Sequence, residues 1–324
     1  MRFVEVPRFG GAEVLQIMEA PDLTPQAGEI VVSVKAAGVN FADIMARQGN
    51  YPNVKAAPFR PGYEIAGVVT AVGDSVQGFS GGERVMGMLG DMGGYSSQAA
   101  LPAETAIRLP DTLDFAPATA LLVQGLTAYF LLEAGGLKGG QTGQTVLIPG
   151  AAGGVGSLAV QIAKLKGAGK VIGLASPAKH DLVRSLGADV ALDYTQSGWS
   201  QTALAETGGK GVDIFLDSQG DPATEAFDAL AEKAHWLIFG SQSGSGNALS
   251  PERIWGLVGK NATLRGYNLF GNLAEFGRGL GDLIDWATSG KLTLSAQRFP
   301  LADVARAHEA VSHRQTTGKV VLEP

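Results

Sequence analysis

The first part of the chain alternates short apolar segments with turns rich in glycine and proline. Strand-like segments occupy residues 29–40, 64–76 and 83–88. Turns recur about every 8 to 12 residues, a spacing typical of a small barrel or sandwich of β-strands. One helix is expected over residues 41–48, because Asn40 stands at the N-cap position, Asp43 at N3 and Gly49 just past the last turn.

From about residue 119 the pattern changes to apolar strands that alternate with helical segments. A buried apolar helix is expected first, over residues 117–135. Strands are then expected over residues 145–150, 170–176, 189–194, 212–220 and 235–241. Helices are expected between strands over residues 155–169, 177–188 and 222–231. Apolar strands that alternate with helices indicate a parallel sheet covered on both faces.

After residue 260 the pattern returns to mixed structure, with a helix within residues 273–290 and a strand at 318–324. The predicted division is a β-rich segment (1–118), a parallel α/β domain (119–260) and a C-terminal segment (261–324). A chain of 324 residues is too long for one ordinary core, so two domains are expected.

The run GAAGGVG at residues 150–156 joins an expected strand to an expected helix. A strand, a glycine-rich turn and a helix form the first unit of a dinucleotide-binding fold, in which backbone N–H groups and the helix dipole hold a pyrophosphate. The candidate cofactor-binding residues of this turn are Ala152, Gly153, Gly154, Val155 and Gly156. Ala151 occupies the first glycine position of the usual G-x-G-x-x-G pattern, and a tight connection without a ligand is the alternative interpretation.

The end of the second strand favours NADP(H) over NAD(H). NAD-binding chains carry an acidic residue about 20 residues after the glycines, where it binds the ribose 2′-hydroxyl. Here Ser176 ends the strand, and the first acid, Asp181, falls inside the next helix. Lys179 offers a positive charge to a 2′-phosphate, and Tyr194 offers a hydroxyl donor. The alternative for Lys179 is a solvated surface lysine.

Composition argues against several classes of protein. The net charge of −6 and the lack of a basic block argue against a nucleic-acid partner. No apolar run of about 18 residues is found, so no membrane span is expected, and the N-terminus does not resemble a secretory signal. The chain contains no cysteine, which rules out disulfides and thiolate metal ligands and fits a cytoplasmic location.

Several segments together resemble the zinc-independent quinone oxidoreductases of the medium-chain dehydrogenase/reductase superfamily. Residues 143–164 match the signature of that family at each constrained position, including Gln161 and Lys164. Residues 36–52 resemble it too, especially the branch of zeta-crystallin and the vesicle amine transport protein homologues. The resemblance covers essentially the whole chain and is more specific for the family than for a substrate.

The resemblance implies an α/β fold with two parts: a GroES-like β-barrel catalytic domain, and a Rossmann domain with a doubly wound parallel sheet inserted into it. It also implies an active site in the cleft and homodimers or tetramers that pair through the Rossmann domains. Zinc-dependent relatives hold their metal with Cys and His, whereas Asn40 and Tyr63 stand at two of those positions here. Without cysteine or a close His pair a tetrahedral zinc site cannot be assembled, so no metal is expected.

The resemblance also places catalytic and cofactor residues. Asn40 is the first candidate to donate a hydrogen bond to the oxygen on which negative charge forms. Tyr51 is the second candidate and could also donate a proton. Helix capping by Asn40 and aromatic packing by Tyr51 are the alternatives. The remaining expected cofactor contacts are Thr127, Ser218, Gly240, Ser241 and Arg314.

Other titratable residues are expected to have structural roles at least as much as chemical ones. Asp43 and Glu64 fall near the expected cleft, but they suit a helix cap and an ion pair equally well. The four histidines, among them His308, lie outside the segments expected to line the cleft and are interpreted as surface or structural residues. Water or the cofactor ribose is then expected to supply the final proton.

The favoured function is an NADPH-dependent quinone oxidoreductase that transfers a hydride from the nicotinamide to a quinone without zinc. A reductase of the carbon–carbon double bonds of enones and enals is the close alternative, since the chemistry before the choice of acceptor is the same. A non-catalytic NADPH-binding protein, similar to crystallins recruited from this family, is the alternative from another class. The expected partners are NADPH, a small quinone or enone, and a second copy of the chain.

Overall fold

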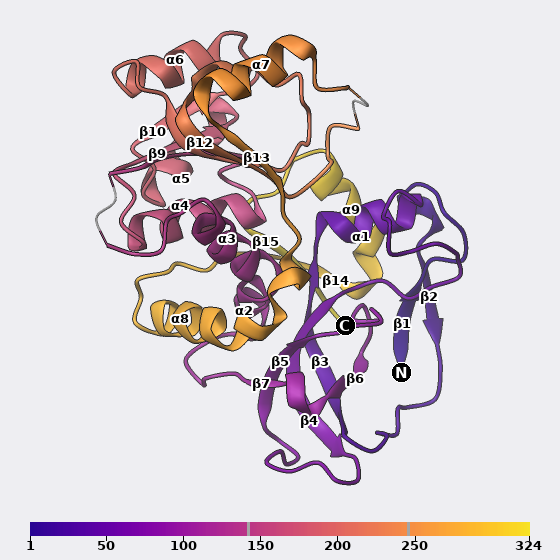
Figure 1. Cartoon of the computed structure of the whole chain (residues 1–324). Helices are drawn as coiled ribbons and strands as arrows, with labels where there is room; N and C mark the ends of the chain where they lie inside the picture. Colours follow the sequence, from indigo (N-terminus) through magenta and orange to yellow (C-terminus); the bar gives the residue numbers. More distant parts are fainter. Residues whose placement is uncertain (141–142, 245–246) are drawn as a thin grey trace. The chain divides into compact units, whose positions relative to one another are not determined.

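The computed structural model describes residues 1–140, 143–244 and 247–324 of the chain. These residues form two compact units. The N/C unit consists of Met1–Gln124, Leu283–Gly290 and Leu294–Pro324, and the central unit consists of Gly125–Asp282 and Lys291–Thr293. Each unit has a β-sheet of its own (Figure 1).

The N/C unit is built on a largely antiparallel sheet. Its strands in spatial order are β14 (Ala296–Pro300), β15 (Lys319–Glu323), β3 (Glu29–Val39), β4 (Glu64–Val72), β5 (Arg84–Met88) and β7 (Ile107–Arg108), with β6 (Gln98–Pro102) paired to β3. A separate antiparallel pair is formed by β1 (Arg2–Glu5) and β2 (Gln16–Glu19). Because β15 pairs with β3, the C-terminal tail belongs to the same sheet as the N-terminal segment.

Short helices accompany this sheet. They are α1 (Phe41–Gln48), α2 (Phe115–Ala118) and α9 (Val304–Ser312), with the 3-10 turns η1 (Ala12–Val14), η2 (Ala103–Thr105), η3 (Thr119–Leu121) and η7 (Leu301–Asp303). The bounds predicted for α1 are confirmed: Asn40 is its extended N-cap residue, and Gly49 ends it in the left-handed region at a φ of 78°. Glycine adopts that conformation without steric cost.

The central unit is built on a parallel sheet. Its strands in spatial order are β10 (Val190–Asp193), β9 (Lys170–Ala175), β8 (Thr145–Pro149), β11 (Val212–Asp217), β12 (Leu230–Ile238) and β13 (Thr263–Gly266). Counted along the chain from β8, this order is 3-2-1-4-5-6, the doubly wound order of dinucleotide-binding folds. The strand order therefore reverses between β8 and β11, which lie side by side.

The helices within residues 123–288 are α3 (Val123–Ala134), α4 (Gly154–Leu165), α5 (His180–Ser185), α6 (Trp199–Glu206), α7 (Pro251–Lys260) and α8 (Phe276–Thr288), with the 3-10 turns η4 (Pro177–Lys179), η5 (Glu225–Ala229) and η6 (Leu269–Glu275). Of these, α4, α5, α6 and α7 pack against strands of this sheet (Figure 1). Because β13 joins the sheet, the central unit extends to Asp282, beyond the boundary placed at residue 260 from the sequence.

Two predicted helices differ in the structure. The helix expected over 117–135 is divided into α2, η3 and α3, because Leu122 leaves the helical region with a ψ of −105°. The helix expected over 222–231 is only the short turn η5, because the chain from Leu230 onward extends to pair with β11 as β12. In both places pairing with residues far along the chain outweighs local helix propensity.

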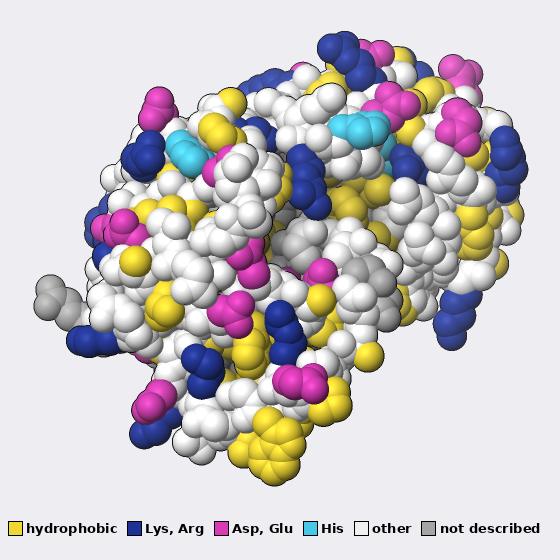
Figure 2. Space-filling view, turned by 90° about the horizontal axis from the view of Figure 1, so that it is seen from above, with side chains coloured by type: hydrophobic (Ala, Val, Ile, Leu, Met, Phe, Trp, Pro, Cys, Tyr) yellow, Lys and Arg dark blue, Asp and Glu magenta, His cyan; other side chains and the backbone are white. Residues whose placement is uncertain are grey.

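Two features bear on the expected partners: the burial of one long apolar segment, and the distribution of charged side chains on the surface. The segment Phe115–Ala134 is long and apolar enough by composition to cross a membrane, although no apolar run of that length was expected from the sequence; 83% of its apolar window is buried inside the protein. Such burial is typical of a core helix. On the face shown in Figure 2, Lys and Arg side chains are interspersed with Asp and Glu.

Candidate functional site

The residues predicted to bind a cofactor follow the carboxyl ends of the parallel strands in the central unit. The register brings these ends to one edge, since Pro149 pairs with Leu174, Ala175 with Asp193 and Asp217 with Ile238. Ala152 to Gly156 follow β8, Ser176 and Lys179 follow β9, and Tyr194 follows β10. Ser218 follows β11, and Gly240 and Ser241 follow β12. Ligands of doubly wound sheets bind at this edge, beside the strands where the order reverses.

The glycine-rich turn after β8 forms a cradle of backbone. Helix α4 starts at Gly154 with Gly153 as its N-cap, and Gly150 is left-handed at a φ of 60°. A Cβ atom at Gly156 would lie 2.2 Å from the Gly150 carbonyl oxygen, so the first turn of α4 rests directly on the loop. Backbone N–H groups at the start of a helix attract an anion, and this cradle fits the pyrophosphate of a dinucleotide.

The turns after β11 and β12 are joined tightly to each other. A Cβ atom at Gly240 would lie 2.4 Å from the Ser218 carbonyl oxygen. Asp217, which is not among the residues predicted for the site, accepts hydrogen bonds from the Trp236 indole at 2.9 Å and from the backbone N–H groups of residues 219 and 220 at 2.8 and 3.0 Å. Burial raises the pKa of Asp217, and these hydrogen bonds act against the rise. An acidic residue at the end of an otherwise apolar strand is the sequence feature that could have identified Asp217.

The two residues predicted for a 2′-phosphate lie in neighbouring turns. Lys179 ends η4 after β9, and Tyr194 follows β10, which pairs with β9. Burial lowers the pKa of the Lys179 ammonium. The ring nitrogen Nε2 of His180 lies 3.1 Å from the Ala175 carbonyl oxygen and ties the η4 turn to the strand. Thr127, predicted on a helix beneath the nicotinamide, is buried on α3.

In the N/C unit, Asn40 belongs to a buried polar cluster formed by β3, β4 and β15. Its Nδ2 donates to Glu64 Oε1 at 2.8 Å, and its Oδ1 accepts from the Lys319 ammonium at 3.0 Å. Lys319 also pairs with Glu64, and both side chains have 0% exposure. Its neighbours thus fix the Asn40 amide, while Asp43 accepts from the Asn40 backbone N–H at 2.7 Å as the N3 residue of α1.

A second buried chain continues from Asp43. Asp43 accepts from the Tyr95 hydroxyl at 3.0 Å, the Tyr95 oxygen lies 3.3 Å from His308 Nε2, and His308 Nδ1 lies 3.5 Å from Arg47. Since the single Tyr95 proton goes to Asp43, His308 must donate from Nε2 and accept from Arg47 at Nδ1. His308 is therefore neutral and structural.

The pKa values of Asp43 and His308 shift in opposite directions. Burial raises the pKa of Asp43 from 3.8 to about 7. Burial and then the Arg47 charge lower the pKa of His308 from 6.5 to about 3. Between about pH 3.8 and 6.5 the native state holds a proton on Asp43 that the unfolded chain lacks, and the unfolded chain holds a proton on His308 that the native state lacks. Stability from His308 is lost as the pH falls, stability from Asp43 is lost as the pH rises, and the two nearly cancel.

Replacing Asp43 with asparagine should expose the His308 contribution alone. Between about pH 4 and 6.5, the free energy of unfolding of Asp43→Asn should rise with pH by about 1.4 kcal/mol per unit more steeply than that of the wild type. Denaturant unfolding at several pH values measures this, with Asp91→Asn at an exposed site as the control. Parallel curves for Asp43→Asn and wild type would refute the opposed shifts.

Tyr51 and Arg314 complete the predicted residues of this unit. The Tyr51 ring packs edge-on against Tyr63, with ring centroids 6.2 Å apart. Burial and the nearby Asp43 charge raise the pKa of Tyr51, so its hydroxyl keeps its proton at neutral pH. Arg314 lies on the turn between α9 and β15, in the left-handed region at a φ of 57°.

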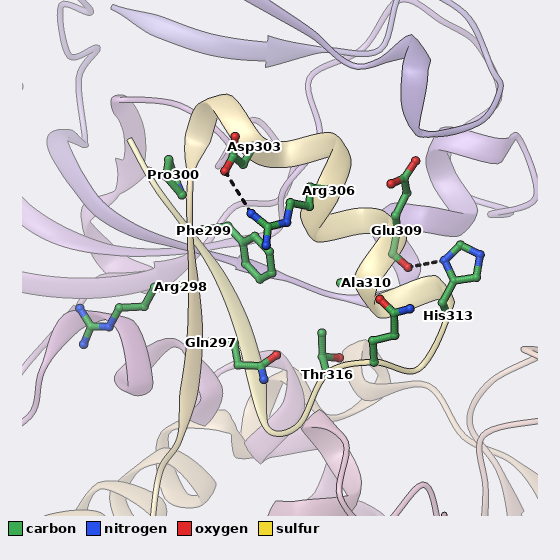
Figure 3. A pocket seen from close by; sticks show the side chains of 11 residues that line it. Gln297, Arg298, Phe299, Pro300, Asp303, Arg306, Glu309, Ala310, His313 and Thr316 are labelled. Carbon is green, nitrogen blue, oxygen red and sulfur yellow. Dashed lines mark hydrogen bonds and ion pairs between the residues drawn. The ribbon is translucent and has the colours of Figure 1, made fainter.

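A surface cavity of about 620 Å³ lies elsewhere in the N/C unit, between β14 and α9 (Figure 3). Among the residues that line it, Arg306 lies 3.9 Å from Asp303, and His313 Nδ1 lies 2.9 Å from the Glu309 carbonyl oxygen. The described residues that line it include no predicted site residue. Among all the residues that the structure describes, no group of three or more His, Cys, Asp or Glu side chains is placed to hold a metal ion.

Comparisons with known proteins match both parts of the chain. A family model for the alcohol dehydrogenase GroES-like domain matches residues 26–111, and a model for zinc-binding dehydrogenases matches residues 186–322. The quinone oxidoreductase of Pseudomonas aeruginosa is 34% identical over 325 residues, with 99% of each chain covered. A 2-haloacrylate reductase of a Burkholderia species is 33% identical, with 98% of each chain covered.

A solved structure is similar over the whole length. The Escherichia coli quinone oxidoreductase complexed with NADPH superposes with a TM-score of 0.91 at 32% identity, with 100% of both chains covered. Together with the strand order and the glycine cradle, these comparisons fix the family of the chain and the GroES-like and Rossmann-like character of its sheets.

Proposed function

Because the chain belongs to the zinc-independent quinone oxidoreductase family of the medium-chain dehydrogenases/reductases, we propose that it is an NADPH-dependent quinone oxidoreductase. The observation that carries this proposal is the glycine cradle at the strand-order reversal, in a chain that matches quinone oxidoreductases over its full length. A cytoplasmic location belongs to the same proposal, and the lack of cysteine supports it.

The turns at the sheet edge would hold the cofactor. Residues 152–156 would bind the pyrophosphate through backbone N–H groups, and Lys179 with Tyr194 would bind the 2′-phosphate. The other proposed contacts are Thr127, Ser176, Ser218, Gly240, Ser241 and Arg314. When bound, NADPH supplies a hydride to an electron-poor acceptor.

The N/C unit would stabilise the charge that forms on the acceptor oxygen. An amide nitrogen carries two N–H groups, and Glu64 takes one from Asn40, so the second is the proposed donor to the oxygen. Tyr51 remains protonated at neutral pH and would donate the proton that completes reduction. A fixed donor requires no reorganisation as charge develops, which is the source of its catalytic effect.

A second candidate function is reduction of an activated carbon–carbon double bond. The 33% identity to a 2-haloacrylate reductase over nearly the full length favours this alternative. The same Asn40 amide would then stabilise an enolate oxygen in place of a quinol oxygen.

Absorbance at the nicotinamide band tests the function and the cofactor preference together. We expect NADPH oxidation with a naphthoquinone or an ortho-quinone to be faster than with an enone, unchanged by EDTA, and faster than NADH oxidation.

Lys179→Gln should lower kcat/KM for NADPH by about 10-fold, the scale of one charge-assisted hydrogen bond, and leave kcat/KM for NADH unaffected. Lys210→Gln at an exposed position is the matched control. Enone preference would establish the second candidate, and NADPH binding without turnover of any acceptor would refute both.

We also propose that two copies of the chain pair through their central units. Strand β13 is exposed along its length at the edge of the parallel sheet, where unpaired backbone groups can accept another strand. Nearby in the sequence, α7 exposes 47% of Ile254, 72% of Trp255 and 57% of Val258. Clustered exposed apolar side chains typically mark a protein–protein contact.

Light scattering after gel filtration tests this pairing. The wild type should have twice the 33.4 kDa mass of one chain, and Trp255→Glu combined with Val258→Glu should have the mass of a single chain. Leu182→Glu, at a partly exposed leucine on α5, should leave the mass of the wild type unchanged. A monomeric wild type, or a double variant that stays dimeric, would contradict this interface.

A further inference from the structure

We infer that Lys319 is a positioning residue for the Asn40 amide: paired with Glu64, its ammonium determines which side of that amide presents N–H. The inference rests on the proposed function, because it gives Lys319 a role in orienting the proposed donor to the substrate oxygen. It concerns a lysine that the sequence shows only as the first residue of the last strand.

The Lys319 ammonium has its full set of partners inside the protein. Its three N–H donors face the Glu64 carboxylate, Asn40 Oδ1 at 3.0 Å and the Val39 carbonyl oxygen at 3.3 Å. The side chain is 0% exposed. No donor is left for a substrate, so Lys319 does not act on the acceptor directly, and any effect on the reaction passes through its neighbours.

The charges of Lys319 and Glu64 determine the orientation of the Asn40 amide, that is, which neighbour its oxygen faces and which its nitrogen faces. An ammonium only donates hydrogen bonds, and an ionised carboxylate only accepts them. The amide oxygen must therefore face Lys319 and the amide nitrogen must face Glu64, as observed. The reverse orientation would set N–H groups against the ammonium and an oxygen against the carboxylate, an arrangement made worse by the low dielectric of a buried site. Neutral neighbours would impose no such choice.

The surrounding backbone is built to admit this pair. A Cβ atom at Gly38 would lie 2.4 Å from Glu64 Oε1 and 2.7 Å from Lys319 Cε. The second Glu64 oxygen accepts from the Val123 backbone N–H at 2.8 Å, where the apolar helix is interrupted. A buried ion pair often adds little stability over an apolar pair of similar volume, so orientation of a functional group is a physical reason to retain one.

A neutral version of the pair tests the inference. Lys319→Met alone leaves Glu64 buried and unpaired and can prevent folding, so the principal variant is Glu64→Gln with Lys319→Met. Its kcat for the preferred quinone should fall by roughly 10-fold, as for loss of one charge-assisted hydrogen bond, with KM for NADPH changed less than about two-fold. The matched control is Glu133→Gln with Lys166→Met, which neutralises a mostly buried pair at 2.9 Å in the central unit and should not lower kcat.

The decisive measurement repeats the neutral pair in an Asn40→Ala background. If Lys319 acts through the amide, the neutral pair should cause no further loss of kcat once the amide is gone. The same 10-fold loss in both backgrounds, or no loss with Asn40 present, would overturn the inference while the wild type remains an active reductase. If the wild type does not oxidise NADPH with any of the quinones or enones tested, the proposed function is refuted, and this inference is refuted with it.

Discussion

Replacing Asn40 with alanine is expected to lower kcat by about 100- to 1,000-fold, the usual effect of removing one donor to a developing oxyanion. The reason is geometric: the Asn40 amide is buried and held by Glu64 and Lys319, so water cannot take its place in the same orientation. KM for NADPH should change little, because the predicted cofactor turns lie in the central unit. Steady-state rates at saturating NADPH and quinone measure the loss.

The control for this change lies at the other end of the same helix. Asn50 follows α1 and is exposed, so Asn50→Ala should keep the wild-type kcat. If Asn40→Ala lowers only thermal stability and leaves kcat within a few-fold of the wild type, Asn40 is a structural N-cap residue of α1, and the oxyanion donor must be sought elsewhere. The most direct second candidate is then Tyr51.

The sequence predicted the parts of the site that depend on local pattern. The bounds of α1, the turn after β8 and the alternating strands all follow from periodicity, glycine and capping residues within a few positions of each other. The candidate Asn40 came from a family resemblance at such a local motif. What surrounds Asn40 could not be found in that way.

The partners of Asn40 come from distant parts of the chain. Glu64 is 24 residues away and Lys319 is 279 residues away, and they meet only because β3 pairs with both β4 and β15. Lysine is rarely buried, so the pattern of the last strand gives no reason to place Lys319 in a core. The interruption at Leu122 has a similar origin, since the Val123 N–H that follows it is bonded to Glu64.

The second large effect is expected from a substitution in the glycine-rich turn after β8, the proposed pyrophosphate site. Gly156→Ala should raise the Kd for NADPH by at least about 100-fold, on the scale of two lost hydrogen bonds to a charged group. The new Cβ would lie 2.2 Å from the Gly150 carbonyl oxygen and 2.9 Å from Ala151 Cα, and these are backbone atoms that cannot rotate away. The loop must therefore move off α4, which turns its N–H groups away from the pyrophosphate position. Titration of NADPH by calorimetry measures the change.

The same substitution where space is free separates a lost cradle from a general effect. Gly277 lies on α8, and a Cβ atom there would meet no atom within 4 Å, so Gly277→Ala should keep the wild-type Kd for NADPH. A folded Gly156→Ala protein with unchanged NADPH affinity would show that the turn after β8 is only a tight connection. Loss of NADPH affinity without loss of folding would establish the turn as the pyrophosphate site, because only the distance between the loop and the helix has changed.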